Sequence, residues 1–449
     1  MPCGTICFRE EGCRGLTDSR ERLTAELFPE VAPPRLSWQV VATTIAALVA
    51  LTLAGMLRVG GAGLADTLYA EDGEIFVTQA LHHSIWHTIT TPYAGYLHLA
   101  PRLITAVVTR GPTAEFALGI ALSCAFVVGA LSVLVYRATA GHLRSRSLRA
   151  ALAVTIALLP TAQPEVLGNM ANLQWYFIAA SVVVLLWNPT SRVEIALSCG
   201  VLFVCALSEP LTVLLAPIAL ARVILVPGWR GRAVVTAMAS GLVLQFVGMQ
   251  LGEASREGLH ADPNPIRVAG QATLHVFGRA IFGMRWLPDG HSITRKGLTA
   301  IAVAIVAAAA VYAWRRLPDE RALLAMLAIT VALTFAGPTI ISGVSAPRYA
   351  VVAIVTLLTA LAIVLDRALV ELPRSQARPI AAAAAALALV VLAANYRLPV
   401  PRTAGPRWSA GLTSARADCA RDASHDALIT IPPRDDKGWH VLVPCDEVE

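Results

Sequence analysis

The sequence predicts an all-α polytopic membrane protein with about eleven transmembrane helices. Of its 449 residues, 56% are hydrophobic and only 15% are charged, whereas soluble domains carry about 25% charged residues. The apolar residues gather in long blocks such as Val40–Leu57 and Ala117–Val135, close to the ~20 residues that a helix needs to cross a bilayer. These observations exclude a soluble enzyme, a disordered chain and a disulfide-rich secreted domain.

Eleven apolar segments are the expected membrane spans. Pro160 is expected to kink the third, and the fifth and sixth are short and separated only by residues 208–210. The segments are 37–58, 114–136, 149–167, 173–188, 193–207, 211–227, 233–251, 297–314, 322–341, 349–366 and 379–396.

The distribution of basic residues predicts the orientation. Fourteen of them lie in or near the breaks on the side of the N-terminus, while the three short breaks on the other side (161–172, 208–210 and 342–348) contain only Arg348. Because cytoplasmic loops are enriched in basic residues, the tail 1–36 is expected to be cytoplasmic. An odd number of spans then places the C-terminal tail, 397–449, outside the cell. The preference for arginine over lysine suggests a bacterial source, and hence a bacterial plasma membrane.

The apolar stretch Leu97–Thr109 is interpreted as an interfacial or re-entrant helix. It contains His98, Pro101 and Arg102, and counting it as a span would place the basic residues at 137–149 outside. Residues 37–396 are then one transmembrane domain with two large external loops, 59–113 and 252–296.

The first external loop contains the sequence's clearest chemical signal. Asp66, Glu71, Asp72 and Glu74 lie within nine residues, and apolar residues then recur at four-residue spacing through 74–89. This spacing predicts an amphipathic helix on the outer membrane surface.

Two interpretations of Asp72 stay open. As a helix N-cap it would accept a hydrogen bond from the backbone of its own helix. Alternatively, Asp72 or Glu71 is a general base, because a carboxylate near lipid and other acids can have a raised pKa suited to accepting a hydroxyl proton.

The pattern resembles the GT-C superfamily of integral-membrane glycosyltransferases. The resemblance rests on the Glu71-Asp72 pair after the first span, the helix 74–89 and the aromatic-rich segment Pro92–His98. It implies a polyprenyl-phosphate sugar donor on the outer leaflet and a glycan or lipid acceptor in the cell envelope. Members differ in which acid is the base, and here Asp72 is the first candidate and Glu71 the second. The resemblance covers the architecture of roughly residues 37–396, but its specific part is the first loop.

Departure of a lipid phosphate calls for a cationic partner. Arg348, beside Tyr349 at the outer end of a span, is the main candidate for a bidentate phosphate contact, and Arg102 is a second. The alternative for Arg348 is an interfacial arginine that extends to the membrane surface beside an anchoring tyrosine.

Polar and aromatic residues near the other external segments are candidates for substrate binding. Polar groups at membrane depth tend to be functional, and aromatic faces can stack on sugars. For Trp175 and Tyr176 the aromatic belt of the membrane surface is the favoured interpretation, and Tyr93 and Tyr96 have the same ambiguity. The candidates are Tyr93, Tyr96, His98, Glu165, Gln174, Trp175 and Tyr349.

No metal site is predicted. His83 and His87 have the i,i+4 spacing of a helical chelate but lack the acidic partner of a metalloprotease motif, so an ordinary polar helix face explains them better. A divalent cation at Glu71 and Asp72 is a second interpretation of that pair, and the cofactor is otherwise unknown.

The C-terminal tail is expected to form a small external cap. Ala427–Ile431 and Val441–Val443 read as short strands separated by a turn at 432–436. Cys419 and Cys445 bracket both strands in an oxidising compartment, which predicts a disulfide between them. Two unpaired thiols in a disordered tail are the alternative.

These features favour a glycosyltransferase that transfers a hexose or a pentose in cell-wall biogenesis and that works in the lipid bilayer. A lipid-linked sugar flippase or other polytopic transporter is the alternative, and it would place charges within the spans and show paired halves. A membrane scaffold would use the external acids only as helix caps. No nucleophile–histidine arrangement supports an acyltransferase, and no basic patch with interleaved aromatics supports nucleic-acid binding.

Overall fold

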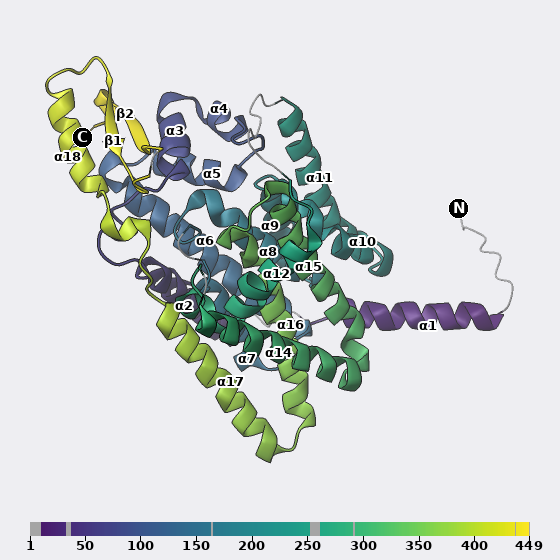
Figure 1. The fold of residues 1–449 in the computed structure, drawn as a ribbon. Helices are drawn as coiled ribbons and strands as arrows, with labels where there is room; N and C mark the ends of the chain where they lie inside the picture. Colours follow the sequence, from purple (N-terminus) through teal and green to yellow (C-terminus); the bar gives the residue numbers. More distant parts are fainter. Residues whose placement is uncertain are drawn as a thin grey trace, which may run out of the picture.

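The structure of the protein, a computed structural model, describes residues 10–32, 37–162, 165–251, 261–290, 292–435 and 437–448. The chain is mostly helical, as the sequence predicts (Figure 1). Within the described residues, seven helices are long and apolar enough to cross a membrane. They are α2 (Trp38–Met56), α6 (Phe116–Ala138), α11 (Trp229–Leu251), α14 (Ile293–Arg316), α15 (Arg321–Ser342), α16 (Ala350–Glu371) and α17 (Arg374–Asn395).

The other four predicted spans contain shorter helices: α7 (Arg146–Ala157), α8 (Leu173–Leu186), α9 (Arg192–Ala206) and α10 (Ala216–Leu225). The predicted kink at Pro160 is wrong, because α7 ends before it. Leu158 already has ψ of 32° and caps the helix. Proline disfavours helical conformation in the residue before it, so a helix generally stops ahead of this position.

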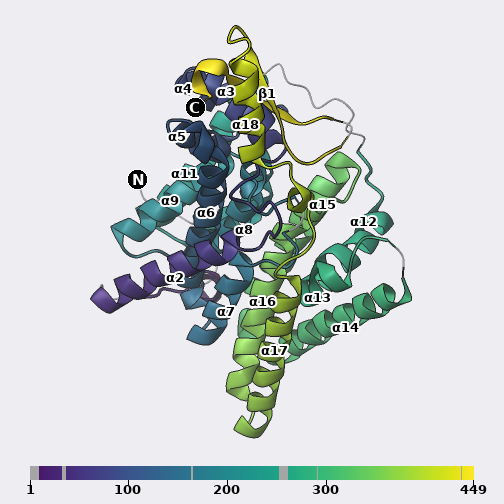
Figure 2. The same ribbon diagram turned by 90° about the vertical axis from the view of Figure 1, so that its left-hand side faces the viewer.

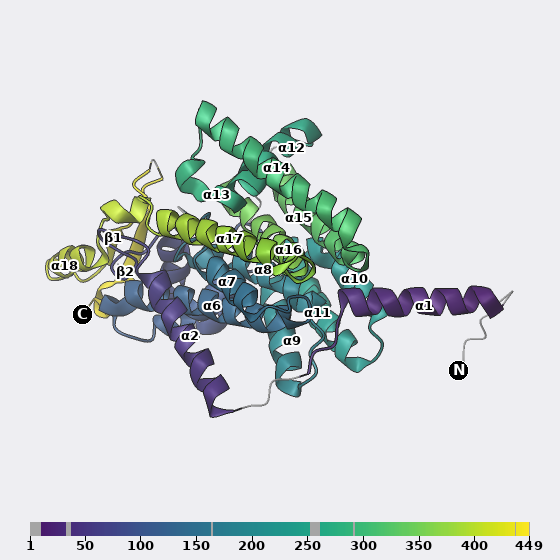
Figure 3. The ribbon, with the colours of Figure 1, turned by 90° about the horizontal axis from the view of Figure 1, so that it is seen from below.

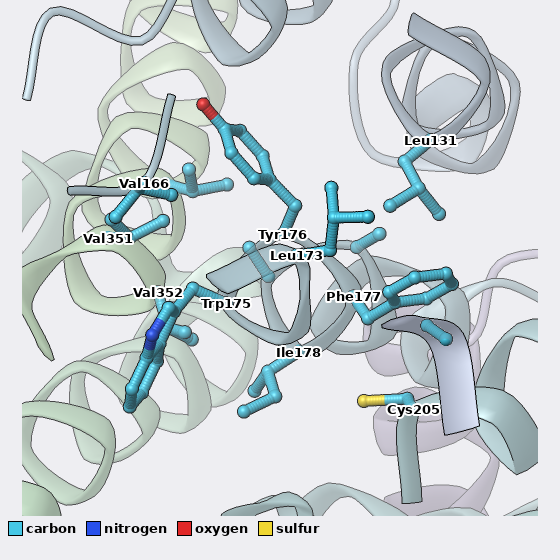
Figure 4. Close-up of a cluster of buried hydrophobic side chains, with 14 of the residues drawn as sticks. Leu131, Val166, Leu173, Trp175, Tyr176, Phe177, Ile178, Cys205, Val351 and Val352 are labelled. Carbon is cyan, nitrogen blue, oxygen red and sulfur yellow. The ribbon is translucent and has the colours of Figure 1, made fainter. Parts of the chain in front are cut away.

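Helix α8 is the centre of the bundle. Every residue from Leu173 to Leu186 is buried, as expected for a helix that is apolar on all sides. Figure 4 shows its side chains surrounded by residues of α6, α9 and α16, among them Leu131, Cys205 and Val352.

The single helix predicted over 74–89 is wrong. The first loop instead contains a π-helical turn η1 (Asp72–Val77) and the helices α3 (Thr78–His82), α4 (Ile85–Thr90) and α5 (Leu99–Val108). The break falls at His83, which is extended, and the Ser84 side chain then accepts a hydrogen bond from the His87 N–H and starts α4. Serine is a strong N-cap, and it overrides the apolar periodicity here.

The second loop and the N-terminal tail contribute further helical elements. The second loop forms α12 (Pro265–Ala272), a π-helical turn η6 (Thr273–Gly278) and α13 (Arg279–Trp286); its residues 252–260 and 291 lie outside the described part. Helix α1 (Glu10–Leu27) of the N-terminal tail projects away from the bundle (Figure 3).

The C-terminal tail contains the predicted strand pair. A short 3₁₀ turn η9 (Pro401–Ala404) and helix α18 (Trp408–Cys419) precede β1 (Asp426–Thr430) and β2 (His440–Pro444), which pair antiparallel with Leu428 opposite Leu442. Residue 436 of the predicted turn lies outside the described residues. Cys419 and Cys445 form a disulfide with 5.5 Å between their Cα atoms.

The tail packs on the first loop. Figures 1 and 2 show α18 and the strands beside α3 and α4. The Trp408 N–H donates to the Asp66 carbonyl oxygen, and the Ala70 N–H donates to that of Pro432, both at 2.8 Å. The inward side chains of the strands, Ile429 and Val441 among them, are buried in this contact. The first loop and the tail therefore form one layer over the bundle.

The breaks between helices gather at two opposite ends. At one end, called here the loop end, Arg402 donates to the Gly168 carbonyl oxygen at 2.8 Å, and the Leu99 N–H donates to that of Leu207 at 3.2 Å. At the arginine-rich end, Arg137 pairs with Glu194 at 2.7 Å, and the carboxylate of Asp366 accepts from the backbone of the break at 144–145.

Candidate functional site

A cavity of about 700 Å³ lies at the loop end of the bundle. Its walls come from the first loop, the start of α8, the break before α10 and the neighbouring ends of α11, α15 and α16. Residues predicted from the sequence line much of it: Glu71, Tyr93, Tyr96, His98, Gln174, Trp175, Arg348 and Tyr349. The fold thus brings together side chains from three segments that are far apart in the chain.

The two adjacent acids of the first loop have different surroundings. Glu71 is partly exposed and lines the cavity. Asp72 is fully buried, and its carboxylate oxygens accept hydrogen bonds from the backbone N–H groups of Met170 at 2.9 Å and Ala171 at 3.0 Å. The N-cap interpretation of Asp72 needs correction, because its carboxylate caps the turn before α8 rather than its own helix. Asp72 is also not among the residues that line the cavity.

Asp72 also has a charged partner from the C-terminal tail. Nη2 of Arg402 lies 3.8 Å from its Oδ2, and the two side chains are 3% and 0% exposed. Burial raises the pKa of Asp72 to about 7, while the charge of Arg402 and the two backbone hydrogen bonds oppose that rise. Ionisation of Asp72 near neutral pH consequently depends on Arg402.

An ion pair stands beside the cavity. Nη1 of Arg348 lies 2.5 Å from Oε2 of Glu165, and each side chain is about one-third exposed (35% and 33%). The Tyr349 ring packs against Trp175 with 5.4 Å between centroids. The guanidinium is thus held in place yet accessible to a ligand in the cavity.

The aromatic-belt interpretation is wrong for Trp175 and Tyr176. The two side chains are only 3% and 2% exposed, whereas belt residues lie at the lipid surface. The indole N–H of Trp175 instead donates to the Asn172 side-chain oxygen at 3.1 Å, inside the protein.

Arg102, the second phosphate candidate, does not line the cavity. It is fully buried and donates to the side chain of Gln79 at 2.5 Å and to the carbonyl oxygen of Thr91 at 3.0 Å. Its guanidinium also lies 4.9 Å from the centre of the Phe76 ring. Arg102 therefore braces the segments of the first loop against one another.

The sequence reasoning missed Glu209, which lines the cavity and is only 2% exposed. Its carboxylate accepts from the Tyr96 hydroxyl at 3.3 Å, and that hydroxyl accepts from the Gln174 amide at 3.4 Å. The ring of His98 stacks on Tyr96 at 4.0 Å. The sequence did contain a signal for Glu209, because it is an acidic residue between two apolar segments and acids at membrane depth tend to be functional.

One wall of the cavity is apolar and reaches the outside of the bundle. Val213, Met249 and Ile341 line it and are 52%, 38% and 48% exposed. Met249 and Ile341 lie near the ends of α11 and α15, two helices that are long and apolar enough to cross a membrane. The cavity therefore joins a polar interior to an apolar, exposed side of the bundle.

The histidines do not form a metal site together with the acids. His83 and His87 are exposed, and their rings lie 4.4 Å apart across the start of α4. Across the described ranges, no group of three or more His, Cys, Asp or Glu side chains could hold a metal ion. For the cation interpretation of Glu71 and Asp72, both oxygens of Asp72 are already engaged by backbone N–H groups.

No protein-family model matches the chain, and no curated protein matches it. The chemistry of the site is therefore argued from the cavity. It combines an accessible carboxylate, a guanidinium, aromatic faces and an apolar, exposed wall, which suits a ligand that is partly apolar and partly polar and anionic.

Proposed function

We propose that the protein is an integral-membrane glycosyltransferase that moves a sugar from a polyprenyl-phosphate donor to a hydroxyl of a cell-envelope glycan or lipid. The observation that carries the proposal is the convergence of Glu71 and Arg348 in a cavity with an apolar, exposed wall. This convergence agrees with the resemblance of the first loop to the GT-C superfamily. The lipid chain of the donor would lie along the apolar wall, and its sugar and phosphate would occupy the polar interior.

The proposed base is Glu71 rather than Asp72. Glu71 lines the cavity, whereas both oxygens of Asp72 are engaged by backbone N–H groups. The carboxylate of Glu71 takes the proton of the acceptor hydroxyl as its oxygen forms a bond to the anomeric carbon. The bond from that carbon to the phosphate oxygen breaks, and polyprenyl phosphate leaves with the electron pair.

Arg348 stabilises the charge that develops on the leaving phosphate. A guanidinium carries five N–H donors, so its contact with Glu165 leaves others for phosphate oxygens. Glu165 fixes the orientation of the guanidinium, as preorganised electrostatic stabilisation requires. Trp175, Tyr349 and the Glu209–Tyr96–Gln174 chain offer an aromatic face and polar groups to the sugar.

The proposed topology has eleven spans in a bacterial plasma membrane, with a cytoplasmic N-terminus and an external C-terminus. It is supported by the two ends of the bundle, because the arginine-poor breaks contact one another at the loop end and the arginine-rich breaks lie at the opposite end. A fully buried α8 needs fewer residues than a lipid-exposed span, since protein surrounds it.

A reporter that is active only outside the cell should work when fused near Gly95 or Ala410 and fail near Ser145. Activity at Ser145 would overturn this topology.

The function is tested by glycan and glycolipid profiling of a deletion strain. The strain should lack one envelope glycosylation and accumulate its lipid-linked sugar donor. Wild-type protein should restore the product. Glu71→Gln should not restore it at equal expression, while Glu115→Gln, a substitution just after that loop and outside the cavity, should. An unchanged glycan and donor profile in the deletion strain would contradict the proposal.

A further inference from the structure

We propose that Arg402 of the C-terminal tail is a positioning residue for the cavity, because it balances the charge of Asp72 and so keeps that carboxylate clamped on the backbone before α8. The inference rests on the proposed function only for its effect on catalysis. The clamp itself is a structural claim, and it can be tested without any substrate.

Arg402 reaches into the first loop from a segment 330 residues away in the chain. It is 2% exposed, and it donates to the carbonyl oxygens of Thr67 at 3.3 Å and Gly168 at 2.8 Å. Its guanidinium also lies 4.7 Å from the centre of the Tyr69 ring. Arg402 therefore joins three segments: the tail, the first loop and the turn before α8.

Asp72 couples two walls of the cavity. Its neighbour Glu71 lines one wall, and the backbone that Asp72 caps begins the segment that carries Asn172 and Trp175 on another. Asn172 holds the Trp175 indole and donates to the Glu165 carbonyl oxygen at 3.3 Å. The distance from Glu71 to the Arg348–Glu165 pair thus depends on whether the Asp72 carboxylate keeps both backbone hydrogen bonds.

An ionised carboxylate accepts both bonds well, whereas a protonated one offers a poor acceptor at its hydroxyl oxygen. A buried carboxylate without a cation tends to take up a proton. The other titratable groups that face this pair are Glu71, Tyr69 and Cys124, and none of them is a cation. Arg402 is consequently the group that keeps the clamp charged.

The test is hydrogen–deuterium exchange of the full-length protein in lipid nanodiscs, read on peptides that cover residues 168–176. After correction for intrinsic exchange, Arg402→Met should accelerate exchange there by about tenfold or more at neutral pH, as expected for the loss of a charge-assisted hydrogen bond. Arg402→Lys should stay near wild type because it retains the charge. The matched control is Arg407→Met, which removes an exposed tail arginine that lies 3.6 Å from Asp66, and it should leave these peptides unchanged.

A second measurement stands even if Arg402→Met fails to fold. In the wild type, exchange over 168–176 should accelerate as the pH falls below neutral and Asp72 takes up a proton. In Asp72→Asn this pH dependence should disappear, because the amide does not titrate. Protection that is independent of pH in the wild type, or equal loss in Arg402→Lys and Arg402→Met, would overturn the charge-balancing role.

Activity gives a separate readout. In Arg402→Met the acidic limb of the pH–rate profile for donor turnover should move to higher pH, with donor KM changed less than kcat. If the exchange results hold but no donor is turned over by any variant or by the wild type, the clamp stands and the proposed glycosyl transfer fails.

Discussion

Replacing Trp408 by alanine tests how the C-terminal tail is anchored to the first loop. The indole is 1% exposed, its N–H donates to the Thr113 carbonyl oxygen at 2.8 Å, and its ring lies 6.3 Å from that of Phe116. Truncating a buried tryptophan costs about 3–5 kcal/mol, because apolar contact is lost and a cavity remains. The carbonyl oxygen of Thr113 would also lose its donor.

We expect this loss to make local opening of the tail easier. Since about 1.4 kcal/mol corresponds to a tenfold change in an equilibrium, amide exchange in β1 and β2 should accelerate by about two to three orders of magnitude. The assay is hydrogen–deuterium exchange in nanodiscs, read on peptides that cover residues 426–444.

Leu428→Ala is the matched control, since this side chain lies on β1 but is 58% exposed. Exposed substitutions usually change stability by less than about 0.5 kcal/mol, so exchange should change by less than about threefold. Unchanged protection of the strands in Trp408→Ala would refute the reasoning, because the tail would then be held by contacts other than this indole.

Three further predictions concern charge and covalent links. Arg348→Lys keeps the charge but loses the planar fork, so donor affinity should fall by about tenfold; unchanged affinity would favour the interfacial role of Arg348. Burial disfavours protonation of His82, but its hydrogen bonds to the Thr78 carbonyl oxygen and to Asp426 outweigh burial and raise its pKa. Protonated His82 therefore stabilises the contact between the first loop and the tail at low pH, and this stabilisation is lost as the pH rises through the raised pKa. Protection of the tail amides from exchange should decrease between about pH 5.5 and about pH 8. His82→Ala should make this change in protection smaller. Cys419→Ser removes the disulfide that closes a loop with a sequence separation of 26. Hydrogen exchange should show the tail destabilised by about 3 kcal/mol. Free, alkylatable thiols at both positions in the non-reduced wild type would contradict the disulfide.

The sequence was most informative where local patterns determine structure. Apolar block length predicted the long helices, and the two short apolar stretches of the tail, separated by a turn, predicted both strands within one residue at each end. Tyr93, Trp175 and Arg348, which the sequence singles out as separate candidates, line one cavity.

The details that depend on side-chain direction could not be predicted in this way. Nothing in the sequence tells which of the two adjacent acids faces a cavity and which is buried. The π-helical turn places Glu71 at the cavity and buries Asp72. Arg402 looked like one of several basic residues in a polar tail, because nothing local marks it as the partner of an acid in the first loop. Ser84 was an available cap signal, but the sequence-based prediction gave more weight to the apolar spacing around it.

The most direct test of the central claim is release of polyprenyl phosphate from a panel of polyprenyl-phosphate sugars by purified protein in nanodiscs, measured together with donor binding. We predict that the wild type cleaves at least one donor in the presence of an envelope acceptor. Glu71→Gln should bind that donor with unchanged affinity and release polyprenyl phosphate at least about a hundredfold more slowly, as expected for the loss of a general base. Wild-type rates in Glu71→Gln would contradict the assignment of the base, and binding without release for every donor would contradict glycosyl transfer.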